Sequence, residues 1–261
     1  MTDPGYVVIG RGRLGLSLAG ALGCPVLEGR TARLVPDGSL CLIAVPDQHV
    51  RDLACRLQGR NAMFVHLSGA YGLELLDPLA QRGDSVGTLH PLQSFPAVRT
   101  AEAFAGTFFA IDASTEQLCE ILARLAGKLG GWSARVRAPE RATYHAAATM
   151  AGPLVVALLS IAVRQFERAG LDSEQALDAV LPFLTGTVAN LRAQRLPGAL
   201  IGPIRRGDPE TVSRHLAALD PAARAAYVVL SREAIELARR AGLGQQALDE
   251  LARVLAIAKT E

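Results

Sequence analysis

Three glycines near the start of the chain have a spacing that suits binding chemistry. The apolar run Tyr6 to Ile9 precedes Gly10, Gly12 and Gly15 in the pattern G-x-G-x-x-G, and a helix-like run follows. The first glycine permits a tight strand-to-helix turn, the second lets the backbone approach a pyrophosphate, and the third lets the helix pack on the strand. This order of elements predicts a dinucleotide-binding turn.

The residues between these glycines, Arg11, Arg13 and Leu14, belong to the same turn. Arg11 and Arg13 add positive charge near the phosphates, although both could equally be solvated side chains. We expect all three in the cofactor site.

The second half of such a fingerprint is an acid about 20 residues further on, which binds the ribose 2′-hydroxyl of NAD. Here the chain reads Glu28-Gly29-Arg30-Thr31. Glu28 could be that acid, but glycine occupies the expected position. A guanidinium and a hydroxyl, from Arg30 and Thr31, suit a 2′-phosphate. We therefore predict NADP(H) as the cofactor.

Polar residues also follow the later strands of the predicted sheet. Ser68 follows one strand, and His90 follows the next in a stiff loop bounded by two prolines. Val45 and Pro46, after an earlier strand, could border the nicotinamide, or Pro46 could simply begin the next helix. Ligands bind at the carboxyl edge of such sheets, so we expect these residues at the active edge.

The first turns of a long helix carry Arg141, His145 and Thr149 at positions i, i+4 and i+8. This spacing places them on one helix face. We expect Arg141 to hold a substrate carboxylate in a two-pronged contact, and His145 or His90 to be the proton donor. The alternative is that Arg141 and Tyr144 make structural hydrogen bonds and His145 is buried.

The elements that must position these residues change character along the chain. Up to residue 137, short β-like runs alternate with helical runs, which predicts a mainly parallel sheet covered by helices on both faces. Beyond Pro139 only helical patterns remain. We predict a Rossmann-type α/β domain over residues 1–137, which binds NADP, and an all-α substrate and dimerisation domain over residues 138–261.

The predicted strands cover residues 6–9, 25–27, 40–45, 63–67, 85–89, 106–111 and 132–136. The predicted helices before the all-α domain cover residues 47–57, 73–81 and 115–129. The helices of the all-α domain are expected over residues 138–170, 173–191, 209–219, 222–241 and 245–259.

Composition excludes several classes of function. The 261 residues are half hydrophobic with a net charge of +2 and no blocks of like charge, so we expect no nucleic-acid partner. The four cysteines lie far apart and no metal site is expected. Only Lys128 and Lys259 are lysines, which argues against a lysine-based active site. The first residues carry no signal-peptide pattern, so we expect a cytoplasmic protein.

The first predicted helix of the all-α domain is almost wholly apolar over residues 146–163. This length raises the possibility of a membrane span. Gly152-Pro153 interrupts the run, and a helix that is apolar all round also suits a domain interior or a dimer interface. We expect no membrane association.

Several motifs resemble one family over nearly the whole chain. They are the glycine turn, "VHLSGAYGLELL", "GTLHPLQSFP", "YHAAATMAG" and "GPIRRGDPETVSRHL". Together they resemble bacterial oxidoreductases that join a Rossmann domain to a helical carboxy-terminal domain of unknown function. These look like distant relatives of β-hydroxyacid dehydrogenases, 6-phosphogluconate dehydrogenase and ketopantoate reductase. The resemblance implies a 6-phosphogluconate dehydrogenase C-terminal-like helical domain that pairs in homodimers.

The resemblance also implies an activity, the NADPH-dependent reduction of 2-dehydropantoate to pantoate. Ketopantoate reductases carry a lysine and an asparagine where Arg141 and His145 stand here. The loop after His90 resembles that of prephenate dehydrogenases, and Pro153 replaces an asparagine typical of the family. The substrate is therefore expected to be a small oxo or hydroxy carboxylic acid.

Two alternatives stay open. One is another β-hydroxyacid or prephenate/arogenate-type dehydrogenase. The other is a non-catalytic NADP-binding regulatory protein.

Overall fold

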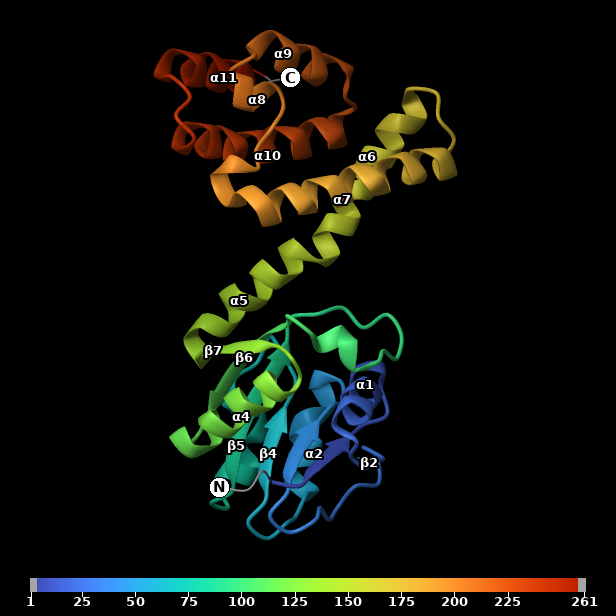
Figure 1. Ribbon diagram of the computed structural model, residues 1–261, viewed down its shortest axis with the longest axis vertical. Coiled ribbons are helices and arrows are strands. Elements are labelled where there is room, and N and C mark those ends of the chain that lie inside the picture. The colour runs from blue at the N-terminus through green and yellow to red at the C-terminus, as the bar shows by residue number, and fades with distance from the viewer. Residues whose placement is uncertain (1–3, 258–261) are drawn as a thin grey trace. The chain divides into compact units, whose positions relative to one another are not determined.

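The computed structural model describes residues 4–257, and the chain divides after Gly152 into two compact units. The first contains a seven-stranded sheet in the order β2-β1-β3-β4-β5-β6-β7 (Figure 1). Its strands are β1 (Tyr6–Ile9), β2 (Val26–Leu27), β3 (Leu40–Ile43), β4 (Met63–His66), β5 (Ser85–Pro91), β6 (Phe108–Ala113) and β7 (Trp132–Arg135). All neighbours are parallel except β5 and β6. The predicted α/β class is confirmed.

Helices cover both faces of this sheet. They are α1 (Arg13–Leu22), α2 (Val50–Arg56), α3 (Asp77–Ala80) and α4 (Glu116–Lys128), with 3₁₀ turns η1 (Asp47–His49), η2 (Leu73–Leu76) and η3 (Ala101–Phe104). The next helix, α5 (Ala138–Ala151), follows β7 and leads away from the sheet, and it buries only Arg141. Side chains alternate across a strand, so Val8 joins one buried cluster while Val7 and Ile9 join another. Near-continuous apolar strands follow from burial on both faces.

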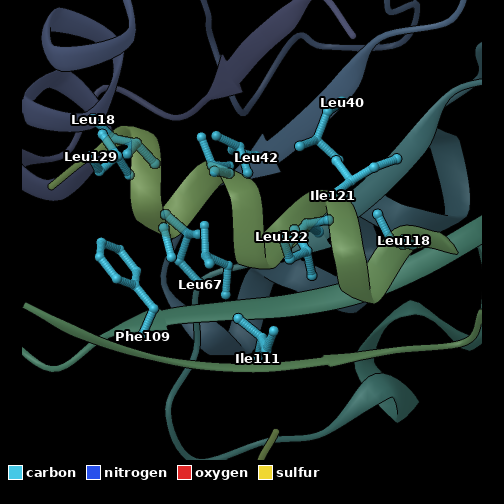
Figure 2. Close-up of a cluster of buried hydrophobic side chains, with 14 of the residues drawn as sticks. Leu18, Leu40, Leu42, Leu67, Phe109, Ile111, Leu118, Ile121, Leu122 and Leu129 are labelled. Atoms are coloured by element: carbon cyan, nitrogen blue, oxygen red, sulfur yellow. The ribbon is translucent and has the colours of Figure 1, made fainter. Parts of the chain in front are cut away.

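The cluster between α1, α4 and the sheet is shown in Figure 2. Leu118, Leu122 and Leu125 of α4 are at most 1% exposed, at the i, i+4 and i+7 spacing of one helix face. Each such side chain contributes about 1.5–3 kcal/mol on burial. Thr115 accepts a hydrogen bond from the amide of Leu118 and begins the helix. This core holds β5 and β6 in place, and with them the loop after His90.

The second unit is wholly helical over its described residues. It comprises α6 (Pro153–Arg168), α7 (Ser173–Gly198), α8 (Pro203–Arg206), α9 (Pro209–Ala218), α10 (Pro221–Arg240) and α11 (Gln245–Ile257). The last residues of the helix predicted to reach residue 259 lie outside the described part. Helices α8, α9, α10 and α11 form its core, around Val212, Ala238 and Leu251.

Helices α6 and α7 contribute little to that core. No residue of α6 is buried, and only Ala176 and Val180 of α7 are buried. Large apolar side chains on both helices are exposed, among them Val156 at 68% and Phe183 at 70%. Among the described residues of the helical unit, the two helices therefore present an apolar surface that the rest of this unit does not cover.

The single helix predicted over residues 138–170 is wrong in one respect. The structure divides it at Gly152, whose φ of −123° and ψ of −93° are not helical. The following Pro153 lacks an amide hydrogen and begins α6. Strands give way to helices at Ala138, as expected, but α5 belongs to the first compact unit.

Taken together by length and composition, residues 138–168 form the one described helical stretch apolar and long enough to cross a membrane. One such stretch is weak evidence, and Gly152 interrupts it.

Candidate functional site

The glycine turn joins β1 to α1 at the carboxyl edge of the sheet. Gly10 has a φ of +121°, and a Cβ there would lie 2.3 Å from the carbonyl oxygen of Ala44. A Cβ on Gly15 would lie 2.3 Å from the oxygen of Gly10. Gly12 is the N-cap of α1, so the unpaired amides of the first turn face the space beyond the turn. The turn therefore has the form that a pyrophosphate requires.

This turn forms one wall of a cleft of about 500 Å³. The cleft is lined by Gly10, Arg11, Gly12, Glu28, Gly29, Arg30, Ala44, Val45, Pro46, His49, Asp52, Leu53 and Arg56. It thus brings together Arg11, Arg30, Val45 and Pro46, all four expected at the cofactor site.

Gly29 explains how this cleft stays open. The residue is buried, and a Cβ there would lie 2.8 Å from Cγ1 of Val45. A side chain at this position, including the acid common in NAD enzymes, would displace Val45. The cradle formed by Gly10, Gly12 and Gly29 therefore fits the backbone-hugging shape of a dinucleotide.

Three other residues predicted for the cofactor site lie elsewhere. Arg13 donates to the carbonyl oxygen of Pro96 at 2.8 Å, and Leu14 packs against the α1 core. Thr31 is exposed and does not line the cleft. Arg13 and Leu14 follow Gly12 on α1, and the helical rotation turns their side chains away from the turn.

The carboxyl end of β5 carries the chemistry at the other end of this edge. His90 was expected in the loop after the strand, but β5 extends to Pro91 and includes it. His90 Nδ1 and the hydroxyl of Tyr144 on α5 are hydrogen bonded at 2.7 Å. The His90 ring lies against Gly69, where a Cβ would come within 2.8 Å of its Nε2. The sequence suggests only a structural role for Tyr144. Its hydrogen bond to His90 joins residues that are 54 positions apart in the chain. No local spacing could have revealed this pair.

Burial sets the charge of both partners. It lowers the pKa of His90 to about 4, with a smaller contribution from the positive charge of Arg141. Burial raises the pKa of Tyr144 to about 12. Both groups are therefore neutral at pH 7. A neutral imidazole and a phenol can exchange a proton with each other and with a third oxygen.

His145 lies beside this pair but faces outward. Its ring centroid is 6.4 Å from that of His90, and its side chain is exposed. Thr149 donates to the carbonyl oxygen of His145 rather than facing a ligand. The proposed proton donors thus come together, with His90 inside and His145 at the surface.

Arg141 does not have the position predicted for it. The side chain is 1% exposed, and its Nε donates to the carbonyl oxygen of Val136 at 3.0 Å. The two other nitrogens donate to the carbonyl oxygen of Ser68 and to Thr88 Oγ1. These contacts leave no exposed fork for a carboxylate. The i, i+4 spacing predicts a shared helix face but not its burial, and Arg141 is buried whereas His145 is exposed.

Ser68 belongs to a buried polar network beneath the edge. Its hydroxyl donates to Asp47 Oδ2 at 2.8 Å and accepts from the amide of Ala70. The amide of Ser68 donates to His66 Nδ1, so His66 carries its proton on Nε2 and donates it to the carbonyl oxygen of Gly72 at 2.7 Å. The hydroxyl of Ser68 is therefore occupied, and its structural role is to fix the Gly69 loop under His90.

An aromatic wall continues from Tyr144 toward the edge strand β7. The ring of Phe108 lies 6.2 Å from that of Tyr144 and 4.6 Å from that of Trp132. Trp132 is 60% exposed. These rings extend the His90–Tyr144 pair toward solvent.

Strand order places these parts in one row. The ends of β1, β3, β4 and β5 carry in turn Gly10, Val45, Ser68 and His90, and these strands are neighbours and parallel. Adjacent strands lie about 4.8 Å apart. The glycine cleft and the His90–Tyr144 pair therefore lie a few strand widths apart along one edge, a distance that a dinucleotide spans.

Among residues 4–257 no group of three or more His, Cys, Asp or Glu side chains is placed to hold a metal ion. Cys24, Cys41, Cys55 and Cys119 are free thiols.

Comparison with known proteins agrees with this architecture. A Rossmann-like domain matches residues 31–91, and a domain of unknown function, DUF2520, matches residues 107–234. The chain therefore combines a Rossmann-like domain with a DUF2520 domain. No curated protein matches the sequence at a significant level.

Several solved structures share the fold. Protein TM1727 from Thermotoga maritima matches with a TM-score of 0.75 and 21% identity, over 90% of this chain and 98% of that one. BF3122 from Bacteroides fragilis, named for a proposed NADP oxidoreductase activity, matches with a TM-score of 0.66 and 22% identity, over 90% and 98%. Pyrroline carboxylate reductase from Plasmodium falciparum, with NADP bound, matches with a TM-score of 0.58 and 10% identity, over 100% and 98%. At these identities the likeness establishes the fold.

Proposed function

We propose that this protein is an NADP(H)-dependent oxidoreductase that reduces a small oxo acid. The observation that carries the proposal is the glycine-cradled cleft, lined by Arg11, Arg30 and Arg56, on the same sheet edge as the His90–Tyr144 pair. Structural neighbours named as NADP oxidoreductases or described with NADP bound support it.

In this proposal Gly10, Gly12 and Gly29 hold the dinucleotide and Arg30 faces the 2′-phosphate. The bound NADPH supplies a hydride to the carbonyl carbon. Val45 and Pro46, which line the cleft, would border the reactive ring of the bound cofactor.

Tyr144 donates its hydroxyl proton to the carbonyl oxygen as that oxygen gains charge, which completes the alcohol. His90 holds the phenol in position and returns a proton to it, and His145 connects His90 to solvent. The overall reaction consumes NADPH and one proton and yields the hydroxy acid and NADP⁺.

For the substrate, 2-dehydropantoate is the first candidate, on the resemblance of the sequence to ketopantoate reductases. Other β-hydroxyacid or prephenate-type substrates are the alternatives within the class. NADPH oxidation measured over a panel of 2-oxo acids tests this choice, and failure of 2-dehydropantoate removes it.

A second candidate is the reduction of a C=N bond. The neutral His90 and the rings of Tyr144, Phe108 and Trp132 suit a cationic iminium, which arrives protonated and needs no acid. The structural match to pyrroline carboxylate reductase agrees with it. Tyr144→Phe separates the two, because it removes the acid that only carbonyl reduction requires.

A non-catalytic NADP-binding regulator is the third possibility. It would be favoured if NADPH bound with micromolar affinity, no carbonyl or imine substrate were reduced, and His90→Ala left the biological effect unchanged.

We further propose a cytoplasmic homodimer formed through the helical unit. The exposed apolar side chains of α6 and α7 support this proposal, because a second copy of the chain would bury them. The same burial would explain the apolar stretch at residues 138–168 without a membrane.

A further inference from the structure

Arg56 is the last residue of α2 and lines the cleft together with the loop that carries Arg30. Its Nη2 donates to the carbonyl oxygen of Gly29 at 2.7 Å. Its Nη1 reaches the carbonyl oxygen of Asp52 at a longer 3.3 Å. The guanidinium is thus fixed beside the turn where the ribose of a dinucleotide lies.

The third nitrogen of this guanidinium, Nε, differs from most buried polar atoms of the described residues because it has no hydrogen-bond partner. Arg56 Nε is inaccessible to solvent and has no hydrogen-bond partner among residues 4–257. A buried donor without a partner costs about 1–3 kcal/mol, and such groups in native proteins call for an explanation. Nε itself is out of reach of a ligand in the cleft, but Nη1 and Nη2 each carry a second hydrogen, which is available to an anionic ligand there.

The charges around this point are finely balanced. Glu28 and Asp52 line the cleft together with Arg30 and Arg56. The negative charges of the two carboxylates balance the positive charges of the two guanidiniums. Arg11 is not counted here, because it belongs to the glycine turn, where the pyrophosphate would bind. Without Arg56 the two carboxylates outweigh Arg30, so the site repels a phosphate and Glu28 can accept from a plain ribose hydroxyl.

We propose that Arg56 is the residue that selects NADP(H) over NAD(H), by pairing with the 2′-phosphate in the presence of two carboxylates. The inference rests on the proposed function, in which the protein binds NADP(H). It adds which residue makes the protein prefer this cofactor over NAD(H). Arg30 is exposed, whereas the guanidinium of Arg56 is held by the carbonyl oxygen of Gly29 and is preorganised for a two-pronged contact.

The test is a fluorescence titration of NADPH and NADH with the full chain, its Arg56→Gln variant and an Arg51→Gln control. Arg51 is on the same helix, but it bonds to the carbonyl oxygen of Glu74 and to Asp77 and does not line the cleft. We expect Arg56→Gln to raise the Kd for NADPH about 10- to 100-fold, as for loss of a charged hydrogen bond, and that for NADH less than about 3-fold. Arg51→Gln is expected to change neither.

Equal weakening of both cofactors by Arg56→Gln would overturn the inference, because it would show that Arg56 only supports the Gly29 turn. No change in either would overturn it as well. Arg56→Lys keeps the charge and is expected to lose part of the selectivity, which provides a second variant if Arg56→Gln does not fold. Failure of the unaltered protein to bind either cofactor would instead refute the proposed function, and the inference with it.

Discussion

Tyr144 and His90 form the pair on which carbonyl reduction depends. We predict that Tyr144→Phe lowers kcat for an oxo acid by about 10²- to 10⁴-fold, the range for loss of a general acid. The Kd for NADPH should stay the same, because Tyr144 does not line the cofactor cleft. Steady-state kinetics and a cofactor titration measure the two effects.

Tyr227→Phe is the matched control for this variant. Tyr227 also bonds to a histidine, His215, at 3.0 Å, but it belongs to the helical unit. An unchanged kcat in Tyr144→Phe, or an equal loss in Tyr227→Phe, would contradict the role of Tyr144. Retained imine reduction with lost carbonyl reduction would support the proton-donor step itself.

His66 makes stability depend on pH. Its pKa is lowered to about 4, mainly by burial; the hydrogen bond to Gly72 opposes this shift and the positive charge of Arg141 adds to it. Between pH 6.5 and pH 4, His66 is protonated in the unfolded chain but neutral in the folded protein. The contribution of neutral His66 to the free energy of unfolding is therefore complete above pH 6.5 and is lost as the pH falls toward 4.

We predict that the free energy of unfolding falls over this pH range and that His66→Gln removes about 1.4 kcal/mol per pH unit from the slope, the value for one proton. Denaturant unfolding at several pH values measures it. His90 adds a slope of the same sign, so the difference between the two proteins is the informative quantity. An identical slope in His66→Gln would show that His66 titrates normally.

At the scale of elements, α5 is attached to the sheet mainly by one polar side chain. Arg141 is the single buried residue of this helix, and its guanidinium joins Val136 just after β7, the Ser68 loop and Thr88 of β5. We predict that Arg141→Met lowers the stability of the first unit by about 3 kcal/mol, because it leaves buried acceptors without a donor. Thermal unfolding measures this loss.

Arg137→Met is the control, since Arg137 is exposed at the start of the same helix. Limited proteolysis should cut within α5 faster in Arg141→Met than in Arg137→Met. If Arg141→Met were stable and instead raised KM for the acid substrate alone, Arg141 would bind substrate after all, and its buried position would not represent the working state.

The sequence predicted the elements better than their contacts. Apolar runs locate the central strands β1, β3, β4, β5 and β6 because these strands are buried on both faces, whereas the edge strands β2 and β7 are partly or largely exposed. The glycine turn follows from sterics at Gly10 and Gly15. The contacts of Arg141 and Tyr144 depend on where α5 lies on the sheet, which no local pattern specifies. The sequence does not predict Arg56 as a cleft residue for the same reason. Its place in the cleft depends on its hydrogen bond to Gly29, which is distant in the chain.

The whole molecule carries an apolar surface on α6 and α7 that a partner should bury. We predict a homodimer by light scattering and its dissociation by Phe183→Glu, because Phe183 is 70% exposed and a carboxylate cannot be buried unpaired. Ala217→Glu, at an exposed position of α9, is expected to leave the dimer intact. A monomeric unaltered protein, or one that needs detergent to stay in solution, would contradict this assembly.

The most direct test of the central claim is a crystal structure of the complex with NADP⁺. The account predicts the pyrophosphate on the amides after Gly10 and the 2′-phosphate between Arg30 and Arg56. It also predicts the nicotinamide beyond Val45, so that a carbonyl beside Tyr144 has its carbon about 3–3.5 Å from the reactive carbon of the ring. A cleft that remains empty beside Gly12, or a ring directed away from His90, would contradict it.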